Sequence, residues 1–410
     1  MVAARGHRGC SADALTAPLT VVTEWGARGA EMLAVLFAAL AAAGIAYRWV
    51  LARTRPLSLG LLLAAGAVAL AAAWCSPVLF SSDVYAYAAY GDLARLGLNP
   101  YAHVPPMPGD ALISDAAWQW NGTLPICVYG PAFVAIARAV VALLAPFGTL
   151  AQLQGMRALA SAALLACTVL AYAAFSGSRN ARLRAAATIG LNPVAVWCAA
   201  EGHNDALALA VVLAGFALVR RGFAGTGAAL AALSALLKPP GGAAAVALAA
   251  VDRRARFGAL CGLAASAALS FPLVAGAATE LLPHGAYAPQ ASLQAALAPL
   301  GSVAAIALAV AAAAALTARG IALLRAGKRE GWIWLGLAAW VIVPNPYPWY
   351  GIWLVALATL APKTRAAATA LLLSFASLLR YVPDAVVTPG APISAALGIV
   401  AMLPFAGLLI

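Results

Sequence analysis

One aspartate is placed where a reacting hydroxyl group could meet it. Asp83 comes directly after the charge-free stretch Pro56–Ser82, and a carboxylate there could accept a proton from a hydroxyl group. The alternative interpretation is structural. A short helix is predicted over Val84–Leu96, and Ser82 or Asp83 has the side chain that caps a helix. The sequence alone leaves both interpretations open.

A second polar group is the run Glu201-Gly202-His203-Asn204-Asp205, which precedes an apolar helix. His203 and Asp205 beside a helix N-terminus would form a pocket for hydroxyl groups or an anion. The structural alternative is again a helix cap, provided by Asn204 or Asp205. The spacing typical of a metal site is absent, so neither a metal nor another cofactor is predicted.

Two cations are candidates for binding a phosphate. Lys238 lies between two short apolar segments, just before two prolines, and Arg380 follows another apolar segment. A cation at membrane depth is costly unless its side chain reaches the interface or meets an anion. Each residue therefore either extends to the membrane surface or holds a phosphate group.

Aromatic side chains accompany these polar groups. Tyr87 and Tyr101 follow Asp83, and Trp349 and Tyr350 lie in the proline-rich break Asn345–Tyr350 of a charge-free stretch. Such rings either form a belt at the membrane interface or stack on sugar faces, and composition does not decide between the two.

The elements that must position these residues are membrane helices. Of the 410 residues, 64% are apolar and 9% are charged, whereas a soluble domain is about one quarter charged. Mean hydropathy is +0.92. These values exclude a soluble globular enzyme, a disordered protein and a nucleic-acid-binding protein. The net charge of +12 is explained by the basic loops that membrane proteins keep in the cytoplasm.

The basic residues also predict a topology. Seventeen of the 25 lie in six short clusters, which by the positive-inside rule are cytoplasmic. The clusters are Arg48/Arg53/Arg55, Arg179/Arg182/Arg184, Arg220/Arg221, Arg253/Arg254/Arg256, Arg319/Arg325/Lys328/Arg329 and Lys363/Arg365. The turns between them, which carry the polar candidates, then share the outer face. We expect an all-α, polytopic transmembrane bundle with about 11–13 crossings.

The predicted organisation is one integral membrane domain over residues 30–410, preceded by a short tail over residues 1–29. Its largest outer loop, residues 76–126, should carry short helices at the membrane surface. The stretch Cys127–Phe147 has Arg138 at its centre and Pro131 near its start. It is therefore predicted to be a peripheral or re-entrant helix rather than a full crossing.

Taken in order, these motifs resemble a GT-C-type membrane glycosyltransferase. They run from Ser82-Asp83-Val84-Tyr85 and Asn99-Pro100-Tyr101 through Tyr129-Gly130-Pro131, Asn192-Pro193, Gly202-His203-Asn204-Asp205 and Leu237-Lys238-Pro239 to Pro348-Trp349-Tyr350. Their order and spacing are similar to those of the polyprenyl-phosphate-mannose-dependent mannosyltransferases of bacterial lipoglycan synthesis. The resemblance covers residues 34–379.

The resemblance implies a reaction and a location. Asp83 would be the catalytic base for attack of an acceptor hydroxyl on the donor sugar, with inversion. The donor would be a polyprenyl-phosphate sugar, the acceptor a glycan or lipid-linked glycan, and the location the bacterial plasma membrane. Together the patterns predict substrate contacts from Tyr87, Asn99, Tyr101, His203, Asn204, Asp205, Lys238, Trp349, Tyr350 and Arg380.

Two other classes of protein remain open at this point. A transporter or flippase for a lipid-linked sugar would place polar residues inside its helices and show inverted repeats. Neither feature is evident in the sequence. A non-catalytic assembly protein would leave the outer motifs without a purpose.

Overall fold

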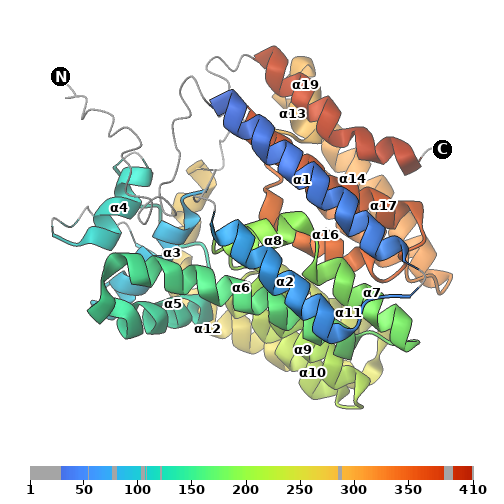
Figure 1. Ribbon diagram of the computed structural model, residues 1–410, viewed down its shortest axis with the longest axis horizontal. Helices are drawn as coiled ribbons and strands as arrows, with labels where there is room; N and C mark the ends of the chain where they lie inside the picture. Colours follow the sequence, from blue (N-terminus) through green and yellow to red (C-terminus); the bar gives the residue numbers. More distant parts are fainter. Residues whose placement is uncertain are drawn as a thin grey trace.

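The computed structural model describes residues 29–408 except 54, 76–80, 103–106, 108, 121, 285–288 and 383–390. Within these ranges every regular element is a helix (Figure 1). The predicted all-α fold is thus confirmed. The tail over residues 1–28 lies outside the described residues.

Three helical stretches are long and apolar enough to cross a membrane. They are Leu33–Ala52 within α1 (Gly29–Ala52), Pro131–Ala174, and α14 (Ser302–Arg325). The bent pair α7 (Arg179–Gly190) and α8 (Pro193–Ala200), which turns by 50°, adds a fourth if it is one span. Shorter apolar helices of 10–17 residues surround them. The predicted 11–13 crossings therefore stay a prediction.

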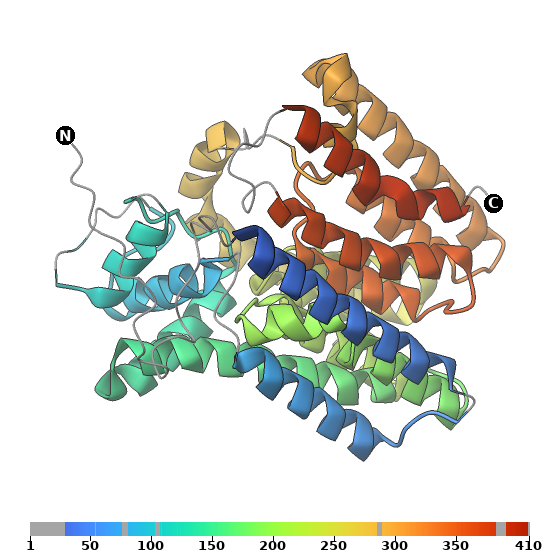
Figure 2. The same ribbon diagram turned by 45° about the horizontal axis from the view of Figure 1, so that its top comes forward.

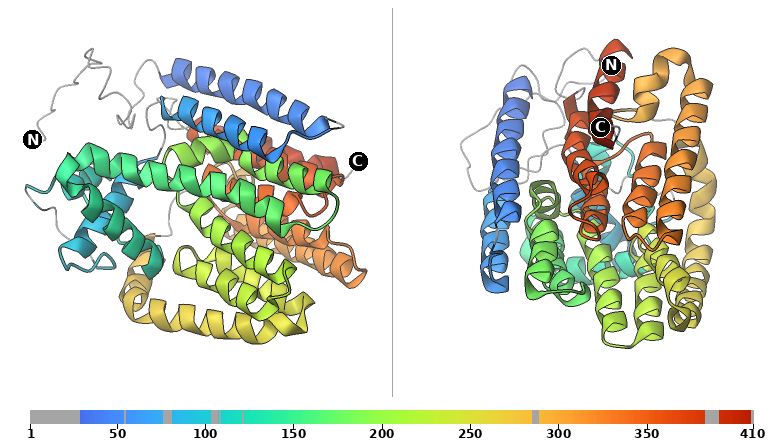
Figure 3. Two further views of the ribbon diagram at one scale, coloured as in Figure 1. Left: turned by 60° about the horizontal axis from the view of Figure 1, so that its bottom comes forward. Right: turned by 90° about the vertical axis from the view of Figure 1, so that its right-hand side faces the viewer.

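Helix α6 (Gly148–Ala174) runs through the first half of the fold. On one side it contacts α2 (Leu59–Trp74), and on another it contacts α9 (Asp205–Arg220). From α9 the contacts continue through α10 (Ala224–Leu233) to α11 (Pro240–Val251) and α12 (Arg256–His284). The left view in Figure 3 shows α2, α6, α9, α10 and α12 in this succession.

The second half of the chain forms a group of helices beside the first. Helix α14 pairs with α15 (Gly331–Ile342), and the break after α15 leads through the turn Pro348–Tyr350 into α16 (Gly351–Ala358). Helix α17 (Arg365–Ala376) packs on α16, and α19 (Ala391–Met402) packs on α13 (Leu293–Leu297). The predicted interruption between residues 345 and 350 is confirmed.

Several predicted basic clusters meet at one end of the bundle. The carboxyl end of α6 accepts hydrogen bonds from Arg182 (Nε to Tyr172 O, 2.7 Å) and Arg220 (Nη1 to Ala173 O, 2.9 Å), and Ser176, two residues beyond it, accepts one from Arg329 (Nη1 to Oγ, 3.4 Å). Cations at this position are favourable because the carboxyl end of a helix carries partial negative charge. Three of the six clusters thus lie together, as the predicted topology requires.

The opposite end carries a lobe made of α3 (Asp83–Arg95), α4 (Ala111–Gln119) and α5 (Pro131–Leu144), seen at the left of Figure 2. The short helices predicted in the outer loop are therefore present. Helix α5 packs along α3, and the two backbones approach closely at Gly91, where an added Cβ would lie 2.6 Å from Ala137. The alanine- and glycine-rich sequence permits such close helix contacts.

The topology predicts which end reacts with an impermeant thiol reagent. Cysteines placed at the exposed positions Thr123, beside α4 in the lobe, and Lys328, at the basic end, test it in a background with Cys10, Cys75 and Cys261 changed to Ser. We expect labelling from outside intact cells at 123 and only after permeabilisation at 328. The reverse pattern would invert the orientation.

Candidate active site

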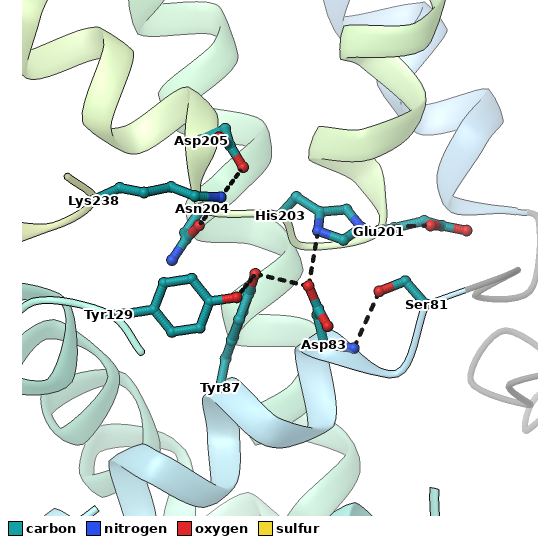
Figure 4. A network of polar contacts seen from close by, with 9 residues as sticks. All are labelled: Ser81, Asp83, Tyr87, Tyr129, Glu201, His203, Asn204, Asp205 and Lys238. Carbon is teal, nitrogen blue, oxygen red and sulfur yellow. Dashed lines mark hydrogen bonds and ion pairs between the residues drawn. The ribbon is translucent and has the colours of Figure 1, made fainter. Parts of the chain in front are cut away.

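Asp83 is the first residue of α3, and its side chain faces the interior of the molecule. Tyr87 donates a hydrogen bond from its hydroxyl to Asp83 Oδ2 (3.2 Å), and His203 Nδ1 lies 3.5 Å from the same oxygen (Figure 4). Ser82 occupies the N-cap position without a side-chain capping bond. The interpretation of Asp83 or Ser82 as the side-chain cap of this helix is therefore wrong.

The surroundings of Asp83 keep it ionised. Burial alone would raise the pKa of this carboxyl group. The hydrogen bond and charge of His203, the charge of Lys238 and the hydrogen bond from Tyr87 outweigh burial, so the pKa lies below its ordinary value. Asp83 is thus a proton acceptor at neutral pH.

The turn Glu201–Asn204 between α8 and α9 brings His203 to Asp83. Gly202 has a φ of +97°, a left-handed conformation that favours glycine. An added Cβ there would lie 3.0 Å from Val84 Cγ2 on α3. The glycine thus permits both the turn and its close approach to the residue after Asp83. Nε2 of His203 lies 3.9 Å from Glu201 Oε2.

Lys238 forms a buried ion pair. Its Nζ lies 2.5 Å from Asp205 Oδ2 and 3.4 Å from Asn204 Oδ1, while Trp353 donates to Asp205 Oδ1 (2.9 Å). Only 7% of Lys238 is exposed, so its side chain is held inside the protein by these partners. Asn204 occupies the N-cap position of α9 without a side-chain capping bond, so the predicted cap is also wrong here.

Tyr129 and Gly130 connect the two polar groups. The hydroxyl of Tyr129 is 3.2 Å from that of Tyr87, and the Tyr129 ring lies 5.7 Å from Lys238 Nζ. Gly130 touches the segment before Lys238, where an added Cβ would be 2.2 Å from Leu236 O. Any larger residue at position 130 would push this segment away from the site.

The second half of the chain completes the site with a stack of planar groups. The Trp349 ring stacks on His203 (centroids 3.9 Å apart) and on Tyr347 (4.5 Å), and the guanidinium of Arg380 lies 4.1 Å over Tyr347. Arg380 donates to Tyr347 OH (3.1 Å), Asn345 Oδ1 (3.4 Å) and Gln290 Oε1. None of its described hydrogen-bond partners is a carboxylate.

Comparison with known proteins identifies the family. Residues 2–254 match the family model described as "Alpha-(1->6)-mannopyranosyltransferase, N-terminal domain", which covers more than half of the chain. The chain belongs to this mannopyranosyltransferase family. It is also 31% identical over 166 residues to alpha-(1->6)-mannopyranosyltransferase A of Mycobacterium tuberculosis. That alignment covers 36% of this chain and 30% of the relative. No solved structure matches.

The part of the chain matched by the mannopyranosyltransferase family contains Asp83, the 201–205 turn and Lys238. The stack of Tyr347, Trp349 and Arg380 lies beyond it. The site therefore combines residues from the part that matches the family model with residues from the second half of the chain, which the fold brings beside them.

Not every predicted contact lies in the cluster. Tyr87, His203, Asn204, Asp205 and Lys238 converge, as do Trp349, Tyr350 and Arg380 from the second half, with the Tyr350 ring 5.2 Å from Lys238 Nζ. Asn99 does not join them. It is exposed and closes a turn, its Oδ1 accepting from Tyr101 N (3.0 Å), while Tyr101 donates to Tyr129 O (2.8 Å) behind the site.

Sequence reasoning did not assign three residues that complete the cluster, Tyr129, Tyr347 and Trp353, and it also missed Arg157, which donates to Ala200 O directly before the 201–204 turn. Tyr129 and Tyr347 each stand in or beside a motif with a neighbouring proline, which could have drawn attention to them. Arg157 and Trp353 lie inside apolar helices with no local pattern. For Arg157, the one available signal is that an arginine in the middle of an apolar helix is costly unless it has a specific partner.

Proposed function

We propose that this chain is a multi-pass membrane mannosyltransferase that uses a polyprenyl-phosphate-linked donor. The observation that carries the proposal is the half-buried carboxyl group of Asp83 beside His203 and Tyr87, in a chain of the mannopyranosyltransferase family. The name of the mycobacterial relative supports mannose as the sugar and an α-(1→6) bond as the product.

The proposed reaction is a single displacement at the anomeric carbon. The oxygen of an acceptor hydroxyl forms a bond to that carbon while the carbon–oxygen bond to the phosphate breaks. The hydroxyl proton passes to Asp83, and the electron pair of the broken bond leaves with polyprenyl monophosphate. Attack from the face opposite the leaving group inverts the anomeric configuration. Asp83 contributes reach and orientation as a general base.

The leaving phosphate gains negative charge as the bond breaks, so a fixed cation in a low-dielectric site would stabilise the transition state. The structure favours Arg380 over Lys238 for this role. Lys238 is already ion-paired with Asp205 at 2.5 Å, whereas the described hydrogen-bond partners of Arg380 are neutral oxygens. Among the described contacts of Arg380, no carboxylate competes with a phosphate. Trp349 and Tyr350 would contact the sugar.

The location follows from the substrates. A polyprenyl chain requires the bilayer, and the sugar and acceptor require water. We therefore place the site at the outer face of the bacterial plasma membrane, with a glycan or lipid-linked glycan as acceptor. The gathering of polar residues at one end, away from the arginines around the carboxyl end of α6, supports a surface reaction rather than a path through the membrane.

The deciding experiment incubates the purified protein with radiolabelled polyprenyl-phosphate mannose and short α-mannoside acceptors in detergent. We expect a product longer by one mannose, with the linkage and anomeric configuration read by NMR. Glucose- and arabinose-linked donors serve as controls for sugar choice. In proteoliposomes, movement of the intact donor between leaflets without a new glycosidic bond would instead identify a flippase.

A further inference from the structure

A fully buried arginine lies behind the candidate base. Arg157, on α6, is 0% exposed. Its Nε donates to Ala200 O (2.6 Å), its Nη2 to Trp74 O (3.4 Å) and its Nη1 to Gln154 Oε1 (3.5 Å). A buried charge is expensive to desolvate and is retained only when it is paired and hydrogen-bonded. The partners of Arg157 therefore indicate what it does.

The shortest of these bonds reaches the end of α8, directly before the turn that carries His203. Ala200 is the last residue of α8, and Glu201, 4% exposed, opposes the positive charge of Arg157. An added Cβ at Gly202 would meet Arg157 Cγ at 3.6 Å on one side and Val84 Cγ2 at 3.0 Å on the other. The turn is thus held between the arginine and the start of the helix of Asp83.

A second contact reinforces the same turn. The Trp74 ring lies 5.1 Å from the Arg157 guanidinium, and its Nε1 donates a hydrogen bond to Ser161 Oγ (3.0 Å). Ser161 in turn donates to Ala199 O (3.4 Å). Arg157 and Ser161 are four residues apart and so share one face of α6. This face therefore bonds consecutive carbonyls at the end of α8.

We propose that Arg157 is a positioning residue: its guanidinium, bonded to the Ala200 carbonyl, fixes the 201–204 turn so that the His203 imidazole faces Asp83. This inference rests on the proposed function for its kinetic consequences. A planar guanidinium suits the task because it donates in several fixed directions at once, which a lysine ammonium does not reproduce.

The first test is Arg157→Lys, which keeps the charge opposite Glu201 and loses the forked geometry. Misplacement by about 1 Å can cost up to about 100-fold in rate. We expect kcat to fall about 10-fold with KM for donor and acceptor within about 2-fold. The matched control is Arg138→Lys, because Arg138 is exposed on α5, and it should behave as wild type. A wild-type kcat for Arg157→Lys would overturn the proposal.

A second pair of variants separates positioning from charge neutralisation. Arg157→Met alone removes a positive charge that opposes the buried Glu201 and can fail to fold. Arg157→Met combined with Glu201→Gln removes both charges and is compared with Glu201→Gln alone. If Arg157 positions the turn, the double variant is at least about 10-fold slower than Glu201→Gln. Equal rates would show that Arg157 only neutralises Glu201.

A third measurement asks whether Arg157 acts through His203. In a His203→Ala background, Arg157→Lys should cause no further loss, since coupled residues are non-additive. A full additional 10-fold loss would overturn the proposal. If the wild-type protein transfers no mannose, the proposed function fails, and the imidazole NMR signal of His203 becomes the test. It should shift in Arg157→Lys and stay unchanged in Arg138→Lys; identical spectra in all three proteins would overturn the positioning role.

Discussion

Replacement of Asp83 by Asn should reduce mannosyl transfer at least about 100-fold, the usual scale for loss of a general base. Asn has almost the same size, and its side-chain oxygen can still accept the hydrogen bond that Tyr87 donates at 3.2 Å. It removes the negative charge that accepts the proton. We therefore expect kcat to fall while the KM of the donor changes little, measured with the radiolabelled donor in detergent.

The pH profile gives an independent check on the same residue. The pKa of Asp83 lies below its ordinary value, because the contacts with His203, Lys238 and Tyr87 outweigh burial. The base form therefore persists as the pH falls through neutrality into mild acid. Protonation of Asp83 should therefore lower kcat/KM only at pH values below the ordinary pKa of an aspartate. Asp83→Asn should remove that acidic limb.

Asp92→Asn is the matched control. Asp92 lies nine residues after Asp83 on the same helix, and therefore on the opposite helix face. It forms an ion pair with Arg95, with 2.6 Å between Oδ1 and Nε. Burial and the neighbouring Asp110 raise the pKa of Asp92 to about 6. Asn can retain the bond from Arg95, so turnover should stay within about 3-fold of wild type. Near-normal turnover of Asp83→Asn would contradict its role as the base and direct attention to Asp205 and Glu201.

Local sequence patterns predicted the elements well because local physics determines them. The short helix of the outer loop is predicted over Val84–Leu96, and the structure has it over Asp83–Arg95. Gly97 predicts where this helix ends, because glycine commonly follows the last residue of a helix. The break before Tyr350 was likewise visible because prolines interrupt a helix. Apolar length and the positions of basic residues indicated membrane helices and a common basic end.

The assembly of the site depends on contacts between distant segments, which local patterns do not contain. Both capping interpretations failed for this reason. A polar residue before an apolar run is a good cap by propensity, yet the side chains of Asp83 and Asn204 meet His203 and Lys238 from other segments instead. The glycines that permit the approach, Gly130 and Gly202, are recognisable as functional only when the neighbouring backbone or side chain is known.

The sequence also left Lys238 and Arg380 as equal candidates for the donor phosphate, and their partners separate them. The ion pair of Lys238 with Asp205 predicts a mainly structural role. Lys238→Ala would leave Asp205 buried without its cation, a loss of about 3–5 kcal/mol. Its melting temperature should therefore fall markedly, measured by thermal unfolding in detergent.

Arg380 should behave differently, because its described partners are neutral oxygens of Asn345, Tyr347 and Gln290. Arg380→Ala removes a charge-assisted contact worth about 1.5–3 kcal/mol, so kcat/KM for the donor should fall roughly 10- to 100-fold. Arg380→Lys keeps a positive charge at this position but lacks the two parallel N–H donors of a guanidinium, so it should recover part of the lost kcat/KM. The KM of the acceptor should not change in either variant. An unchanged donor kcat/KM in Arg380→Ala, with a raised donor KM in a stably folded Lys238→Ala, would assign the phosphate to Lys238 instead.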